Sequence, residues 1–219
     1  MSLEEIIKNI NVSYIKENQD VKKNINLDYS EVKKVNENKK NQSNYPKLLE
    51  FWLQKVPKSN LILDLGCSLG FTTMWLNSHS GMTIGIDNEP IMIKQAKEIH
   101  NYEHFYVDEL NRLNFKENNF DSVFCYDSIK KSNNIRNTLS EIYRVCKGSL
   151  FLIMPLYGLG LKEEIQIYPF QPSTKQELED LVRSSGFRID ESEQIDILEK
   201  TGALIPQSEN QLVYIRGSK

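Results

Sequence analysis

The chain has 219 residues, of which 39% are hydrophobic and 26% are charged, so it is long and apolar enough for one packed domain with an appendage. The net charge is −3 and both signs are dispersed, which gives no general attraction to nucleic-acid backbones or to anionic membranes. No apolar run approaches the ~20 residues of a membrane span, and the polar, acidic start does not resemble a signal peptide. We therefore expect a cytoplasmic protein with no nucleic-acid and no membrane partner.

The cysteines and histidines give no sign of a metal site. Cys67, Cys125 and Cys146 are widely spaced in or beside apolar segments, which is typical of reduced, buried thiols. The chain has no CxxC pair and only three histidines, so we expect no bound metal.

Residues 1–43 form a first segment that is rich in Lys, Asn and Glu. Ile6, Ile7, Ile10 and Tyr14 share one helical stripe, which predicts a short amphipathic helix there. We therefore divide the chain into an N-terminal helical or lid segment, 1–43, and a main domain, 44–219. The main domain opens with an apolar pattern over 44–56 that predicts a helix lying on it.

From Leu61 onward, short apolar runs alternate with helical patterns. The runs lack strict alternation of polar and apolar residues, which is typical of strands buried on both faces of a parallel sheet. This order of strands and helices predicts a doubly wound α/β sheet. The predicted strands are 61–65, 82–87, 104–110, 121–126 and 149–155, and the helices between them are 70–78, 89–100 and 135–147.

The tail follows a different order, with a helix and then two strands that no helix separates. Thr174 and Glu177 have the spacing of a capping box, and Gly186 lies where a helix-ending glycine belongs. Two such strands, 187–195 and 210–217, must pair antiparallel or lie apart. The stretch 156–173 fits neither period, and an irregular loop of this length inside a domain is often functional.

The glycine-broken turn after the first strand is the candidate ligand site, because open α/β sheets bind ligands beyond the carboxyl ends of their strands. Gly66 and Gly70 allow close approach, and the following helix offers unpaired N–H groups to an anion. The dinucleotide pattern GxGxxG fails at Ser68 and Phe71, and no phosphate-binding GK[ST] follows. Asp64 at the end of the strand would repel a pyrophosphate but attract a ligand with ammonium or sulfonium charge. S-adenosylmethionine carries both cations, one carboxylate and no phosphate.

These residues resemble motif I of the class I S-adenosylmethionine-dependent methyltransferases, in "LILDLGCSLG", with Ser68 in place of the middle glycine. Five more stretches match later motifs in order, so the resemblance covers about residues 45–216. It is strongest to the small-molecule, methyltransferase type 11-like group. It implies a Rossmann-like seven-stranded sheet, mostly parallel with the last strand antiparallel, and S-adenosyl-L-methionine as cofactor.

The resemblance also implies roles for single residues. Asp87 would bind the ribose hydroxyls, Asn88 and Met92 would pack the adenine, and Asp108 with the Glu109 backbone would meet the adenine amino group. The whole predicted cofactor site is Asp64, Gly66, Cys67, Ser68, Gly70, Asp87, Asn88, Met92, Asp108, Glu109 and Cys125.

The acceptor side is predicted more coarsely. The end of the fourth strand carries Tyr126, Asp127 and Lys130 where relatives often place substrate-facing groups, and Asp127 is the best candidate base. Tyr157, Tyr168 and Phe170, in the irregular loop, are candidates for the substrate pocket, with plain packing as the alternative. We expect methylation of a small metabolite on oxygen, nitrogen or carbon by a monomer or homodimer.

Two other functions stay open on the sequence alone. The first is a protein of the same fold that binds S-adenosylmethionine or S-adenosylhomocysteine for a non-methyl reaction or a regulatory role. The second is a nicotinamide-dependent oxidoreductase, which the failed GxGxxG pattern disfavours.

Overall fold

The structure, a computed structural model, describes residues 51–52, 54–156, 172–196 and 211–219. The predicted helical segment 1–43 and nearly all of the irregular loop 156–173 lie outside these residues. The prediction of a boundary at residue 44 therefore also stays untested.

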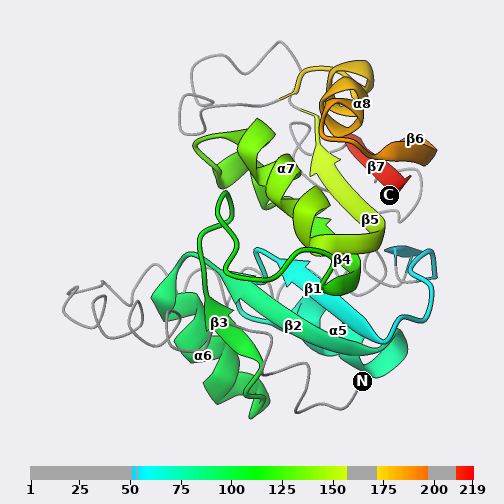
Figure 1. Ribbon diagram of the computed structural model, residues 1–219. Coiled ribbons are helices and arrows are strands. Elements are labelled where there is room, and N and C mark those ends of the chain that lie inside the picture. Colours follow the sequence, from blue (N-terminus) through cyan, green and yellow to red (C-terminus); the bar gives the residue numbers. More distant parts are fainter. Residues whose placement is uncertain (1–50, 53, 157–171, 197–210) are drawn as a thin grey trace.

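The described residues form a single seven-stranded sheet with the order β3-β2-β1-β4-β5-β7-β6 (Figure 1). The four neighbouring pairs from β3 to β5 are all parallel. These five strands are β1 (Leu61–Leu65), β2 (Met82–Asp87), β3 (Phe105–Val107), β4 (Phe120–Tyr126) and β5 (Cys146–Pro155). The sequence therefore predicted β1 and β2 to the residue, whereas β3 is shorter than predicted.

The two tail strands complete the sheet. β7 (Gln211–Ser218) lies between β5 and β6 (Arg188–Asp196) and runs antiparallel to both. Ile153 of β5 pairs with Tyr214 of β7, and Tyr214 pairs in turn with Glu193 of β6. The seven-stranded sheet with its last strand antiparallel is confirmed, and of the two arrangements left open for the tail strands the structure shows the antiparallel pair.

Helices cover both faces of the sheet, as expected for a doubly wound fold (Figure 1). Alternate residues of β1 serve the two faces: Leu63 belongs to a core with α7 and α8, and Ile62 belongs to a core with α5. The helices are α5 (Phe71–His79), α6 (Pro90–His100), α7 (Ile135–Val145) and α8 (Lys175–Ser184). Because strands buried on both faces need apolar residues at every position, their sequences read as continuous apolar runs.

Local signals explain where the later helices begin and end. Asn134 caps α7 by accepting a hydrogen bond from the Asn137 N–H, and Thr174 caps α8 by accepting one from the Glu177 N–H. The predicted cap at Thr174 is confirmed, and Gly186 follows α8 with a φ of +111°. α7 runs directly into β5, so Cys146 and Lys147, which the sequence assigned to the helix, lie in the strand.

The first described residues pack on the end of the sheet that β7 and β6 form. Trp52 stacks on Tyr214 with ring centroids 5.3 Å apart, and Lys55 pairs with Glu191 and Glu193 of β6. The chain before β1 thus reaches β6 and β7, on the same sheet face as α5.

Candidate cofactor site and acceptor side

The loop between β1 and α5, residues 66–70, has the backbone expected of a ligand-binding turn. Gly66, Ser68 and Gly70 have positive φ angles of 79°, 50° and 80°. The N–H groups of Gly66 and Cys67 both donate to the Ile86 carbonyl of β2 at 2.8 Å. The loop is therefore tied to the neighbouring strand, and not only to its own helix.

Gly66 makes room for the loop that follows β4. A Cβ atom at Gly66 would lie 2.1 Å from the Cβ atom of Ser128. The Ser128 hydroxyl donates to the Leu65 carbonyl at 2.5 Å and contacts the Cys125 Sγ atom at 2.9 Å. The loop after β4, which the sequence assigns to the acceptor side, thus lies directly against the loop after β1. Nothing in the sequence marked Ser128.

Asp64 is buried at the end of β1, and its Oδ2 atom accepts a hydrogen bond of 2.6 Å from Thr73 of α5. This carboxylate joins the strand to the helix that follows the loop. It also raises the pKa of the neighbouring Cys67 thiol, although burial is the larger cause. Cys67 is therefore a neutral thiol in a negatively charged environment.

Asp87 lies at the carboxyl end of β2, beside the loop. It is 3% exposed, and its two carboxylate oxygens accept hydrogen bonds from the Ser68 N–H at 2.9 Å and the Glu89 N–H at 3.0 Å. Each oxygen of a carboxylate has two lone pairs, so one acceptor position remains on each. Two such positions suit a pair of neighbouring hydroxyls.

Asn88 and Met92 follow Asp87, one just before α6 and one in its first turn, and both are half-buried. The Ser68 hydroxyl lies 3.8 Å from the Met92 Sδ atom, so α6 begins against the same loop. Ser68, Asp87 and Met92 are thereby brought together, as the sequence predicted from their motifs.

Asp108 is buried at the end of β3, and its N–H donates to the Asp87 carbonyl at 3.1 Å. Its side chain accepts three hydrogen bonds, two from Asn114 and one from the Glu109 N–H. Burial raises the pKa of Asp108. The carboxylate therefore organises the loop 108–114, and only one lone pair remains for an adenine amino group. Glu109 is exposed.

The acceptor side begins at Cys125, whose thiol is buried with a pKa raised to about 12 by burial. Tyr126 is half-buried and follows it at the end of β4. Asp127 has a φ of 53°, an uncommon angle that turns the chain away from the sheet. Its carboxylate accepts a hydrogen bond of 2.6 Å from Lys130, whose side chain is only 9% exposed. Two of the three candidate catalytic residues, Asp127 and Lys130, therefore form an ion pair.

The predicted pocket residues Tyr157, Tyr168 and Phe170 lie outside the described residues. A different depression, of about 470 Å³, lies between the loop after β3 and α7. None of the predicted cofactor residues lines it; its residues are Asn111, Arg112, Leu113, Asn114, Asn137, Ser140, Glu141 and Arg144.

Two further findings concern only the part of the chain that the structure describes. None of its helices combines the length and the apolar character needed to cross a bilayer. Nor do three or more His, Cys, Asp or Glu side chains gather there in a way that could hold a metal ion.

Comparison with known proteins agrees with this arrangement. Residues 63–154, which run from β1 to β5, match the family described as methyltransferase domain. The sterol 24-C-methyltransferase of Kluyveromyces lactis is 27% identical over 106 residues, which are 45% of this chain and 29% of that protein. An uncharacterized methyltransferase of Bacillus subtilis, YodH, is 29% identical over 163 residues and 69% of each chain.

The chain thus spans less than a third of the length of the sterol enzyme. Among solved structures, phosphoethanolamine N-methyltransferase 2 of Haemonchus contortus, in complex with S-adenosyl-L-methionine, superposes with a TM-score of 0.66 at 19% identity. That superposition covers 79% of this chain and 52% of the other, and it shows a shared fold.

Proposed function

We propose that this chain, which matches the methyltransferase domain family over residues 63–154, is a class I S-adenosylmethionine-dependent methyltransferase that methylates a small-molecule acceptor. The observation that carries the proposal is the loop 66–70, tied to β2 and lying directly beside the buried carboxylate of Asp87. A phosphate-free nucleoside with an amino-acid tail fits these features: glycines where a side chain would block its approach, an acid at the end of the next strand, and a helix N-terminus.

The cofactor would be held by groups from three strand ends. Asp87 would accept the two ribose hydroxyls with the lone pairs that its backbone contacts leave over. Asn88 and Met92 would pack against the adenine, with Asp108 and the Glu109 backbone near its amino group. The first N–H groups of α5 would meet the carboxylate, because helix N-termini attract anions. Asp64, in turn, would favour the cationic part of the ligand.

When bound, S-adenosylmethionine supplies an activated methyl group. What this chain has to add is alignment of the acceptor and exclusion of water. The loop after β4, which we assign to the acceptor, contacts the loop 66–70, here called the cofactor loop, where Ser128 meets Gly66. The two substrates would therefore meet at a fixed separation. Asp127 is the candidate base, held by Lys130, and Tyr126 lies beside it.

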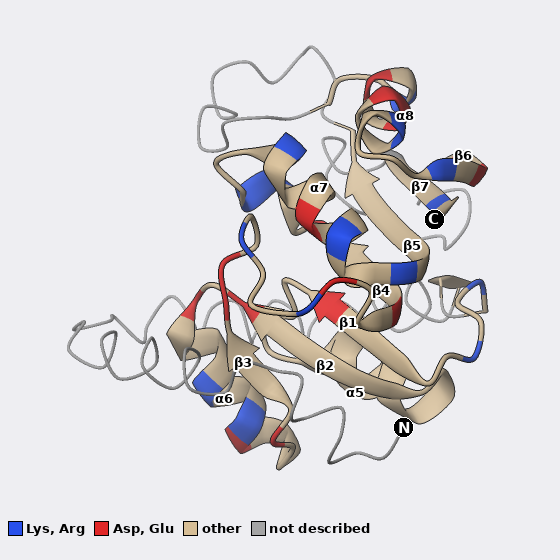
Figure 2. Ribbon diagram, in the orientation of Figure 1, with Lys and Arg blue, Asp and Glu red and all other residues tan. Residues whose placement is uncertain are grey.

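A small acceptor is supported by the distribution of charge. Figure 2 shows basic segments on α6, α7 and β6 with acidic segments among them, which is unlike the continuous basic face of many nucleic-acid-binding proteins. The sterol enzyme that resembles part of this chain is named for a small-molecule acceptor. A test is incubation with methyl-labelled cofactor and a metabolite extract. Label transferred to a small molecule supports the proposal, whereas cofactor binding without any transfer supports the binding or non-methyl alternative.

Asp87 gives the sharpest test of the cofactor site. We expect Asp87→Ala to weaken S-adenosylhomocysteine binding on the order of a hundredfold, because it removes an anionic acceptor for two hydroxyls. Isothermal titration calorimetry would measure the dissociation constant, with circular dichroism to verify the fold.

Asp180→Asn, an exposed carboxylate on α8, is the matched control and should bind like the wild type. Unchanged affinity in Asp87→Ala would count against the site. A thermal-shift comparison of S-adenosylhomocysteine with NAD would test the oxidoreductase alternative, which predicts stabilisation by NAD alone.

A further inference from the structure

His100 joins the far end of α6 to the cofactor loop. It is the last residue of that helix, and the next residue, Asn101, ends the helix with a left-handed φ of 47°. The His100 Nε2 atom lies 2.9 Å from the carbonyl oxygen of Leu69, a residue 31 positions earlier in the chain. A carbonyl oxygen only accepts hydrogen bonds, so Nε2 carries a proton and donates it.

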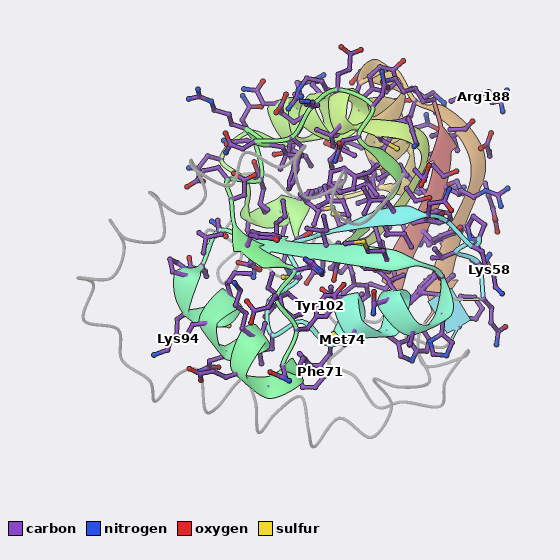
Figure 3. All side chains as sticks on the ribbon, turned by 60° about the horizontal axis from the view of Figure 1, so that its bottom comes forward. Lys58, Phe71, Met74, Lys94, Tyr102 and Arg188 are labelled. Atoms are coloured by element: carbon purple, nitrogen blue, oxygen red, sulfur yellow. The ribbon has the colours of Figure 1, made fainter. Side chains whose placement is uncertain are left out.

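The His100 ring also fills the space beside Gly70. A Cβ atom on Gly70 would lie 3.1 Å from the His100 ring and 2.4 Å from the ring of Phe105 in β3. Phe71, the first residue of α5, packs edge-on against His100 with ring centroids 4.9 Å apart. In Figure 3, Phe71, Met74 and Tyr102 lie close together between the ribbons of α5 and α6.

α5 begins without a side-chain cap, so the backbone before it is held by other contacts. Gly70 is the N-cap residue of α5, and as a glycine it has no side chain that could hold the first turn. The first three residues of the loop are tied to β2: Gly66 and Cys67 donate to Ile86, and Ser68 donates to Asp87, the last residue of that strand. Leu69 is held from α6 by His100. The peptide between Leu69 and Gly70, which precedes the first turn of α5, is thus held on both sides: its N–H group donates to the Cys67 carbonyl at 2.9 Å, and its carbonyl oxygen accepts from the His100 side chain.

We propose that His100 is a positioning residue for the cofactor's amino-acid end, because it fixes the Leu69–Gly70 peptide and with it the N-terminal turn of α5. This inference rests on the proposed function, in which that turn meets the carboxylate of the methionine moiety. His100 acts through the loop and does not touch the ligand. Its removal should therefore weaken ligands that carry the amino-acid part more than ligands that lack it.

The test compares two ligands on two variants. His100→Phe keeps a ring beside Gly70 but loses the donor, and His100→Gln keeps an amide donor that can reach the Leu69 carbonyl. S-adenosylhomocysteine and 5′-methylthioadenosine share the adenosine part, but only the first has the amino-acid end. Titration calorimetry would give both dissociation constants for each protein, and thermal unfolding without ligand would give the stability.

In His100→Phe we expect S-adenosylhomocysteine to bind about tenfold more weakly, as for the loss of one hydrogen bond, with methylthioadenosine changed less than threefold. His100→Gln should bind S-adenosylhomocysteine within about threefold of the wild type. His104→Phe is the matched control, because this neighbouring histidine packs on Tyr102 and not on the loop. It should leave both constants unchanged.

The outcomes distinguish a positioning role of His100, a general packing role and a failure of the proposed function. Equal weakening of both ligands in His100→Phe, or lower thermal stability with unchanged binding, would show a general packing role and overturn the inference. If His100→Phe does not fold, the ratio of the two dissociation constants in His100→Gln decides. A ratio that shifts against S-adenosylhomocysteine would overturn the inference, whereas the wild-type ratio would support it. A wild-type protein that binds neither ligand would instead refute the proposed function.

Discussion

Three residues of the cofactor loop have left-handed backbone angles, and only two of them are glycines. The third, Ser68, has a φ of 50°, and for a side-chain-bearing residue this angle costs about 1–2 kcal/mol. The Ser68 N–H donates to the buried Asp87 carboxylate, which offsets part of that cost. The uncommon angle thus occurs where Asp87, the proposed ribose-binding acid, meets the loop, which is typical of functional sites.

Gly66 is the residue where substitution should cost most for local reasons. In Gly66→Ala the new methyl group would overlap the Cβ atom of Ser128, and alanine would be strained at a φ of +79°. We expect a loss of roughly 2–4 kcal/mol in the free energy of unfolding, the sum of strain and overpacking. Urea denaturation would measure this loss.

A double-mutant cycle with Ser128→Gly isolates the overlap, because that change removes the opposing Cβ atom. The two substitutions together should then cost less than the sum of the single changes. Strict additivity would show that the two loops are not in the contact described. Gly217→Ala is the milder comparison, because its φ is not left-handed and its nearest contact, 3.2 Å from the Phe187 Cβ atom, is tight but does not overlap.

Among the elements, α8 best illustrates how a local sequence signal becomes structure. Thr174 accepts from the Glu177 N–H, as in a capping box, whereas the Glu177 carboxylate accepts from the N–H of Ser173 at 3.0 Å, one residue before the cap. The apolar face of the helix packs beside β6 and β7 through Leu178 and Val182.

Thr174→Ala should therefore lower the free energy of unfolding by about 1 kcal/mol, the usual cost of a lost N-cap. Thr174→Ser keeps the hydroxyl and should stay within a few tenths of a kcal/mol of the wild type. Thermal unfolding of the three proteins would measure the differences. Equal losses in both variants would mean that the methyl group, and not the cap, carries the stability.

Elements with strong apolar periodicity were predictable from sequence, and those set by tertiary contacts were not. β1, β2, α6 and the start of α7 follow directly from their patterns. β3 is shorter than its apolar pattern because the chain turns after Asp108 into the loop 108–114, which the Asp108 side chain holds through Asn114 while its N–H still bonds β2. Ser128 and His100 were not among the predicted site residues, because their side chains bond the backbone carbonyls of Leu65 and Leu69, which are far away in sequence.

At the scale of the whole molecule, stability should depend on pH in two separate windows. Burial lowers the pKa of both His100 and His104. The unfolded chain, with histidine pKa values near 6.5, then binds more protons than the folded one, so stability falls as the pH drops below about 6.5. Hydrogen bonds from Arg144 hold the pKa of Glu141 below its usual range, which adds a second loss below about pH 4.3.

Urea midpoints at pH 8, 7, 6 and 5 should therefore be flat at first and then decline, and the double variant His100→Gln/His104→Gln should decline less. Identical curves for the variant and the wild type would show that other groups govern the acid response.

The whole-molecule architecture was predicted correctly because alternation of strands and helices restricts the topology to few solutions. The family resemblance implied an antiparallel last strand, but the position of β7 between β5 and β6 was not predicted, since no local pattern reveals which strand pairs with which. The ion pair between Asp127 and Lys130 was equally hidden, although both residues had been singled out.

That position of β7 has a consequence for how the protein is made. β7 follows every other strand along the chain, yet it occupies an interior place in the sheet. While the ribosome is still translating, the outer edge of β5 has no neighbour, and β6 has nothing to pair with until β7 emerges. An open, apolar strand edge in a nascent chain can pair with other chains. We therefore expect a chaperone to be needed most in the interval before β7 is synthesised.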